Sequence, residues 1–369
     1  MDYFKKYTSN TLGGSSNQLF FEMPDTEMKT GRIFFKIFKG GTFGYSLLFS
    51  NTIDSTFADG VVSHCNLTCD EWEIIEAKVG KCVFVPSSDS VMRDSSKINE
   101  KVSDFVTLKF SGKISKSVSK GELFWCDEFQ YTFEDGDFLC LEITFRGTKI
   151  PYHEESLLPI YTKTKDGWVY SKKMPIACMI GCDRKVSKRI AYLGDSITQG
   201  IGTPLNSYSH WNSLLSDKLG FENAYWNLGI GYGRASDLAS DGSWIYKANQ
   251  NDIVVLCIGV NDIMRGRLFD EIVYDLDKTV DLLKKENIKV LLQTIPPFNY
   301  NGYNIEKWSE LNLYIKNCLY KKVDGVFDIV PCLCESAETS HIAKYGGHPN
   351  SEGCKKWAEE LYRLLLQSV

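Results

Sequence analysis

The sequence predicts two domains of different classes: an antiparallel β-sandwich of jelly-roll type over residues 1–187 and an α/β domain over residues 188–369. Three observations lead to this prediction. A chain of 369 residues is too long for one ordinary hydrophobic core. Before residue 187, apolar and polar residues alternate as they do in half-buried strands. After it, buried-strand runs alternate with amphipathic helical stretches, which is typical of a parallel sheet covered by helices.

The first domain is expected to contain many short strands. Turns rich in Gly, Asp, Asn and Ser separate its apolar segments, and helical periodicity is almost absent. This spacing favours a sandwich with jelly-roll connections. No cluster of metal-binding or nucleophilic residues stands out in it. The clearest expected strands are residues 32–38, 72–79, 105–110 and 138–145.

The second domain is expected to be a three-layer α/β/α structure, because near-continuous Val, Ile and Leu runs alternate with helical stretches. In such sheets, reacting groups collect at the carboxyl ends of the strands. The expected strands are residues 189–193, 224–228, 253–258, 290–294 and 326–330. The expected helices are residues 209–219, 234–248, 267–286, 304–319 and 351–367.

Charge and composition limit the possible partners. A formal charge of −5 argues against nucleic acid or an anionic membrane as the main partner. No window approaches the roughly 18 apolar residues of a membrane span, and the first residues lack the apolar core of a signal peptide. The sequence therefore predicts a cytoplasmic protein, and it leaves the oligomeric state open.

Nothing in the sequence requires a cofactor. The 12 cysteines include no CxxC pair, and their settings favour reduced thiols. His64, Cys65 and Cys69 lack a second pair of ligands, so no metal site is expected. The Gly-rich stretch 229–233 does not match the dinucleotide-binding pattern in the required register.

Three polar residues stand at places where this architecture puts reacting groups. Ser196 follows the first strand of the second domain, and Asn261 follows the third. His348 precedes the last helix, with Pro349 fixing the loop direction and Ser351 as the expected helix cap. A serine hydroxyl needs a base to become a good nucleophile, and an imidazole serves near neutral pH. Together these residues predict a serine hydrolase.

Around these residues, residues 188–369 resemble the SGNH (GDSL-type) esterase and lipase superfamily, which has a flavodoxin-like fold. The shared blocks are GDS, a glycine after the second strand, GxND, and a His followed by Pro. The resemblance implies that Ser196 is the nucleophile and His348 the general base and acid. It also implies an oxyanion hole formed by the Ser196 amide, Gly231 and the Asn261 side chain. The two-domain order is similar to that of carbohydrate esterases of the family 2 type.

The chain departs from the family pattern at Tyr345, where the family usually has an Asp three residues before the His. A phenol does not stabilise an imidazolium as a carboxylate does. We therefore expect a Ser196–His348 dyad, with a backbone carbonyl holding the ring. Alternatively, a nearby carboxylate takes the place of the Asp, the candidates being Glu335, Glu338 and Glu352.

A second departure concerns the oxyanion glycine. The family pattern N-x-G-x-x-G would place it at Tyr232. Because the donor is a backbone N–H, either Gly231 or Tyr232 is able to supply it, and we favour Gly231.

The function expected from these residues is hydrolysis of a small acyl ester, most simply an O-acetyl group on a carbohydrate or another small molecule. Tyr208, Trp211 and Trp244 either line a sugar-binding cleft or belong to the core. Two alternatives remain: a lipid or thioester acylhydrolase or acyltransferase, and a glycan-binding protein without catalysis. A preference for long acyl chains would distinguish the acylhydrolase or acyltransferase from the small-ester hydrolase. Sugar binding without turnover of any ester would identify the glycan-binding protein.

Overall fold

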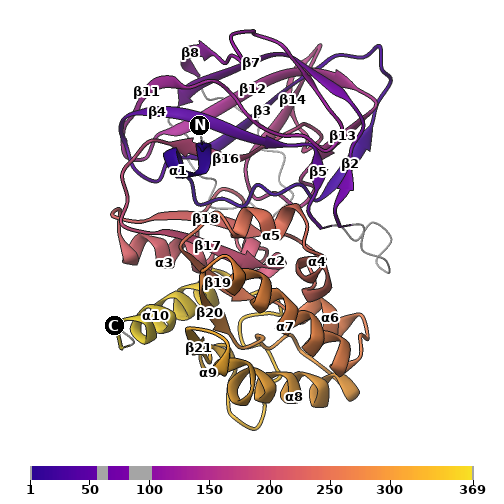
Figure 1. Ribbon diagram of the computed structural model, residues 1–369, viewed down its shortest axis with the longest axis vertical. Coiled ribbons are helices and arrows are strands. Elements are labelled where there is room, and N and C mark those ends of the chain that lie inside the picture. Colours follow the sequence, from indigo (N-terminus) through magenta and orange to yellow (C-terminus); the bar gives the residue numbers. More distant parts are fainter. Residues whose placement is uncertain (1, 56–64, 83–101, 368–369) are drawn as a thin grey trace.

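The computed structural model describes residues 2–55, 65–82 and 102–367. Figure 1 shows two regions. Residues 2–182 form a β region, and residues 189–367 form an α/β region beneath it. In the part of the chain that the structure describes, the predicted class is confirmed: antiparallel strands come first, and a parallel sheet with helices follows. The division into domains at residue 187 stays a prediction, as does the jelly-roll type of connection.

Two larger sheets account for most of the β region. All their paired strands are antiparallel. The first sheet contains β1 (Thr8–Ser9), β16 (Ala177–Cys182), β4 (Gly41–Ser50), β10 (Leu123–Trp125) and β11 (Phe129–Phe133). The second contains β15 (Gly167–Tyr170), β14 (Ile160–Thr164), β3 (Lys29–Lys36), β12 (Phe138–Gly147), β7 (Trp72–Cys82), β8 (Ser103–Thr107) and β9 (Lys116–Val118).

Smaller elements complete this region. They are the helix α1 (Tyr3–Lys6) and the strand pairs β2 (Leu19–Glu22) with β13 (Lys149–Tyr152), and β5 (Thr52–Ile53) with β6 (Leu67–Thr68). Phe34 and Phe35 of β3 and Leu47 and Phe49 of β4 are buried in one hydrophobic cluster, so both larger sheets contribute to the core. The four expected strands correspond to β3, β7, β8 and β12, although β8 ends at Thr107.

The parallel sheet has the strand order β18-β17-β19-β20-β21. In chain order this is 2-1-3-4-5, the flavodoxin-like arrangement, whose crevice lies between the first and third strands. Successive strands pair in parallel. Their bounds are β17 (Arg189–Gly194), β18 (Ala224–Gly229), β19 (Ile253–Cys257), β20 (Lys289–Gln293) and β21 (Gly325–Phe327), close to the expected ones.

The helices follow the predicted alternation with one correction. The stretch 234–248, expected as one helix, is divided into α4 and α5, because Asp241 has φ +58° and the backbone leaves the helical region there. Short helices follow β17, β19 and β21, and the sequence did not predict them. The helices are α2 (Ser196–Gln199), α3 (Trp211–Leu219), α4 (Ala235–Ala239), α5 (Ser243–Ala248), α6 (Val260–Met264), α7 (Phe269–Lys285), α8 (Tyr303–Asn317), a 3-10 turn (Leu319–Lys321), α9 (Val330–Leu333) and α10 (Ser351–Gln367).

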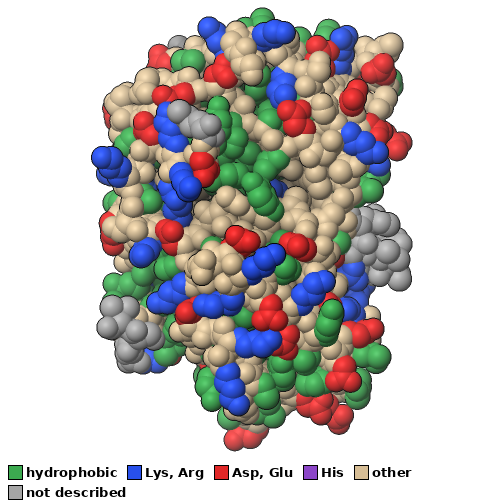
Figure 2. Space-filling model, in the orientation of Figure 1, with side chains coloured by type: hydrophobic (Ala, Val, Ile, Leu, Met, Phe, Trp, Pro, Cys, Tyr) green, Lys and Arg blue, Asp and Glu red, His purple; other side chains and the backbone are tan. Residues whose placement is uncertain are grey.

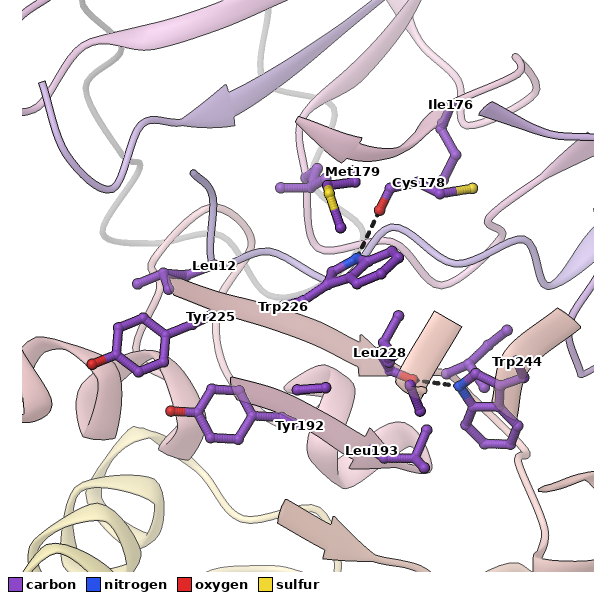
Figure 3. Close-up of a cluster of buried hydrophobic side chains, with 14 of the residues drawn as sticks. Leu12, Ile176, Cys178, Met179, Tyr192, Leu193, Tyr225, Trp226, Leu228 and Trp244 are labelled. Atoms are coloured by element: carbon purple, nitrogen blue, oxygen red, sulfur yellow. Dashed lines mark hydrogen bonds between the residues drawn. The ribbon is translucent and has the colours of Figure 1, made fainter. Parts of the chain in front are cut away.

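The strand β18 lies at the edge of the parallel sheet, next to the β region (Figure 1). The indole N–H of Trp226 on this strand donates to the carbonyl oxygen of Cys178 on β16, at 2.9 Å (Figure 3). On the same strand, the carbonyl of Leu228 accepts from the indole of Trp244 at 2.7 Å. The two regions therefore share a buried interface in which the polar ring atoms have partners.

A buried ion pair also crosses this interface. The Lys247 ammonium on α5 lies 2.6 Å from Oδ2 of Asp54, and both side chains are fully buried. Oδ1 of Asp54 accepts from the Ser243 hydroxyl at 2.6 Å, and the amide of Asn17 donates to Oδ2. These hydrogen bonds satisfy the carboxylate from both regions, which is what a buried charge requires.

The outer surface mixes charges of both signs. On the face seen in Figure 2, blue and red side chains are interspersed over the α/β region, while hydrophobic side chains gather on the β region beside the N-terminus. Within the described residues, no helix combines the length and the apolar character that crossing a membrane requires.

Candidate active site

Ser196 stands where β17 turns into the short helix α2. Asp195 caps this helix: its Oδ1 accepts the amide hydrogen of Ile197 at 2.9 Å. The cap makes Ser196 the first helical residue, where its own amide has no partner within the helix. The Ser196 side chain points to His348, with Oγ and Nε2 2.8 Å apart.

His348 lies in the loop between α9 and α10. Its ring packs at 80° against the ring of Phe298, with centroids 5.2 Å apart. Burial lowers the pKa of His348. Asn350, rather than the expected Ser351, caps α10, because its Oδ1 accepts the Gly353 amide at 3.0 Å. This cap fixes where the loop that carries His348 enters the helix.

No acidic side chain among the described residues hydrogen-bonds the imidazole, and no hydrogen bond to Nδ1 is formed there, so the expected backbone carbonyl is not seen either. Tyr345 packs against Gly353 of α10 and accepts the Asn350 amide with its backbone oxygen at 3.0 Å. Of the three candidate glutamates, Glu335 pairs with Lys344 at 2.8 Å, and Glu338 and Glu352 are exposed.

Asn261 lies in α6, directly after β19. Its Nδ2 donates to the carbonyl oxygen of Gly233 at 3.0 Å, which joins the loop after β18 to the loop after β19. A carboxamide nitrogen has two hydrogens. One of them makes this bond.

Gly231 does not present its amide to an open site. Its N–H donates to Oε1 of Gln199 at 2.7 Å. The next residue, Tyr232, has φ +63° and is about one third exposed, at 36%. A left-handed backbone is unusual for a residue other than glycine and marks a locally constrained loop.

The carboxylates of Asp195 and Asp262 support the backbone beside these loops. Burial raises the pKa of Asp195 to about 7, and the nearby charge of Asp262 adds to the effect. Asp262 accepts the Ala235 amide at 3.0 Å and an Arg267 N–H at 2.8 Å. Both groups therefore hold strand ends and helix starts in place.

Three aromatic residues proposed as either core or sugar contacts belong to the core. Tyr208, Trp211 and Trp244 are 8%, 0% and 1% exposed. Trp211 of α3 stacks on Trp357 of α10, with centroids 4.9 Å apart and an angle of 6°.

The sequence missed two contacts of the site, those made by Phe298 and Gln199. Phe298 follows the fourth strand, and sites in parallel sheets lie at the carboxyl ends of the strands, so the sequence contained a signal for its position. Nothing in the sequence indicated that the Gln199 side chain would bind the Gly231 amide.

Among the described residues, no group of His, Cys, Asp and Glu side chains is placed to hold a metal ion. His64, which belongs to the cysteine-rich cluster considered from the sequence, lies outside the described residues.

Comparison with known proteins gives a match over the α/β region. Residues 192–356 match the model of the GDSL-like Lipase/Acylhydrolase family. No curated protein sequence matches the chain.

Several solved structures are similar to about half of the chain. A member of the lipolytic protein G-D-S-L family from Veillonella parvula is 20% identical, with 48% of this chain and 98% of that one covered and a TM-score of 0.42. The psychrotrophic esterase EstA from Pseudoalteromonas sp. is 17% identical, with 48% and 97% covered and a TM-score of 0.39. An acetyl xylan esterase is 21% identical, with 48% and 99% covered and a TM-score of 0.38.

Proposed function

Residues 192–356 belong to the GDSL-like lipase/acylhydrolase family, and on this premise we propose that the protein hydrolyses small acyl esters with Ser196 as nucleophile and His348 as general base. The observation that carries the proposal is the 2.8 Å distance between Ser196 Oγ and His348 Nε2. A neutral imidazole at this distance accepts the hydroxyl proton as the oxygen attacks.

The proposed reaction proceeds in two halves. Ser196 attacks the ester carbonyl while His348 takes its proton, and His348 then returns that proton to the leaving alcohol. A water molecule, deprotonated by the same imidazole, then attacks the acyl carbonyl, and His348 returns this proton to Ser196 Oγ as the carboxylic acid leaves. No carboxylate takes part, so these two residues act as a dyad, and the perpendicular ring of Phe298 helps to hold the imidazole.

Three donors are proposed for the oxyanion formed during attack. They are the Ser196 amide, the side chain of Asn261 and one amide of the loop after β18. Because the Gly231 amide already donates to Gln199, we assign the loop donor to Tyr232. One such donor typically contributes a factor of about 10²–10³ in rate.

The proposed substrate is an O-acetyl group on a carbohydrate. The β region reaches the loop beside the nucleophile through the polar residues Gln18 and Glu155. Glu155 is partly exposed beside this loop, and a carboxylate there suits a hydroxylated alcohol better than a lipid, whose acyl chain requires an apolar lining.

The test compares wild type with Ser196→Ala on p-nitrophenyl acetate, butyrate and octanoate, and then on acetylated xylo- and manno-oligosaccharides. We expect acetate release that disappears in the variant and little turnover of octanoate. The matched control is Ser213→Ala, which removes another buried serine hydroxyl, one without a hydrogen bond in the described residues. Its activity should equal that of wild type.

The other outcomes identify the alternatives. Faster turnover of octanoate than of acetate would indicate a lipid or thioester acylhydrolase. Sugar binding without turnover of any ester, unchanged by Ser196→Ala, would indicate a glycan-binding protein and overturn the esterase proposal.

A further inference from the structure

A polar contact joins the nucleophile helix to the β region. Gln199 is the last residue of α2, one turn beyond Ser196, and is 1% exposed. Its Oε1 accepts the Gly231 amide at 2.7 Å, and its Nε2 donates to the carbonyl oxygen of Glu155 at 2.7 Å. One carboxamide thus connects α2, the loop of residues 230–233, and the β region. Both of its polar atoms are used.

Glu155 is itself held by a second residue of the β region. Nε2 of Gln18 donates to Oε2 of Glu155 at 2.8 Å, and the Glu155 amide donates to Oε1 of Gln18 at 3.1 Å. A Cβ built on Gly231 would overlap Oε2 of Glu155. The carboxylate therefore packs directly on the backbone of Gly231, and a larger residue at that position would have to displace it.

The same loop is fixed on either side of Tyr232. The Ile230 amide donates to the carbonyl oxygen of Gly194 at 3.1 Å, and the carbonyl oxygen of Gly233 accepts from Asn261. Tyr232, between these bonds, keeps φ at +63°. A strained backbone of this kind persists only where its surroundings hold it. The direction of the Tyr232 amide is consequently set by the groups that hold Gly231 and Gly233.

We propose that Gln199, Glu155 and Gln18 are positioning residues for the oxyanion hole, so that the β region completes the catalytic site. The proposal rests on the esterase function proposed above. An oxyanion donor is effective only when it is held in place before the charge develops, and a displacement of about 1 Å can lower a rate by about 100-fold. The β region thereby acts on the loop through Glu155 and Gln199.

The experiment uses the full chain and the variant Gln199→Met, which keeps the length and volume of the side chain and removes both hydrogen bonds. With p-nitrophenyl acetate, kcat should fall by about 10- to 100-fold while KM stays within about threefold of wild type. Without substrate, hydrogen exchange of the amides in residues 229–235 should become faster. Gln18→Met should also lower kcat and speed up exchange in residues 229–235, but by smaller factors than Gln199→Met. If Gln199→Met does not fold, the Gln18→Met result tests the proposal.

The control is Tyr208→Phe, which removes another hydrogen bond between the regions, in which the Lys36 amide donates to the Tyr208 hydroxyl at 2.9 Å. It should leave kcat and exchange unchanged. Unchanged kcat and exchange in Gln199→Met, or a rise of KM alone, would overturn the proposal. If wild type hydrolysed no ester, the esterase function would fail, and the exchange measurement would still decide whether Gln199 holds the loop.

Discussion

Nε2 of His348 lies within hydrogen-bond distance of Ser196 Oγ, and the imidazole ring packs nearly perpendicular to the ring of Phe298. Burial lowers its pKa below the ordinary value of 6.5, and no acidic neighbour opposes that shift. A histidine paired with a carboxylate would show the opposite tendency, because the negative charge favours the imidazolium. The imidazole therefore stays neutral, and able to accept a proton, at a lower pH than an ordinary histidine.

This gives a prediction for the pH dependence of the esterase. Activity needs neutral His348 and is lost as the pH falls through its pKa, so the acidic limb of kcat/KM should have its midpoint below 6.5. Hydrolysis of p-nitrophenyl acetate measured from acidic to neutral pH gives the midpoint. Tyr345→Phe should leave it unchanged, since this phenol does not hydrogen-bond the ring. A midpoint above 6.5 would mean that a carboxylate reaches His348 in solution.

Asn261 gives the second prediction. Asn261→Ala should lower kcat by about 10²–10³, because it removes an oxyanion donor and the bond that holds Gly233. Asn251→Ala is the matched control, since it removes a buried carboxamide that binds only the backbone of α5. The control should lower the melting temperature and leave kcat unchanged. Equal kcat losses in both variants would assign the effect to stability.

The elements of the site depend on close approach between α2 and the end of β18. A Cβ on Gly229 would overlap the backbone nitrogen of Gln199. The obstacle is backbone, so no side chain can rotate away. The strand and the nucleophile helix can pack at this distance only with glycine at residue 229.

Gly229→Ala should therefore destabilise the fold by about 1–3 kcal/mol, the usual cost of overpacking, and lower kcat by displacing α2. Urea unfolding followed by tryptophan fluorescence measures the loss. At Gly325, an added Cβ would meet the flexible Leu291 side chain at 3.3 Å, so Gly325→Ala should be nearly neutral. A neutral Gly229→Ala would show that the two backbones lie further apart than described.

Sequence patterns located elements better than they located breaks and local contacts. The β17 and β19 segments are nearly continuous apolar runs and α10 is amphipathic, and their bounds were predicted to within one or two residues. The break between α4 and α5 was not predicted, because it depends on a left-handed Asp241. At the site, motifs led to Ser196 and His348, which the fold brings together. The partner of the Gly231 amide was not predictable, because it is set by packing between distant segments.

Across the whole molecule, the buried pair of Asp54 and Lys247 links residues 193 positions apart. Neither charge is exposed. A buried pair adds little net stability over apolar groups, but removing one partner leaves an uncompensated charge. The sequence could not reveal this pair. Asp and Lys are ordinarily exposed residues, and nothing in the sequence relates two positions so far apart.

Lys247→Met should cost about 3–5 kcal/mol of unfolding free energy, because Asp54 would remain buried without its counter-charge. The hydrogen bonds from Ser243 and Asn17 should keep the loss near the lower end. Lys39→Met, which breaks an exposed pair with Asp135, should change stability by no more than about 1 kcal/mol. Urea unfolding of both variants measures the difference, and equal losses would contradict the burial of Asp54.

The edge position of β18 has a consequence for how this protein can be divided. All six residues of the strand are buried, although an edge strand ordinarily leaves one side unpaired. The β region supplies that cover, with Cys178 accepting the Trp226 indole. A recombinant fragment beginning at residue 188 would present a bare apolar strand to other copies of itself. Such a fragment should precipitate on expression.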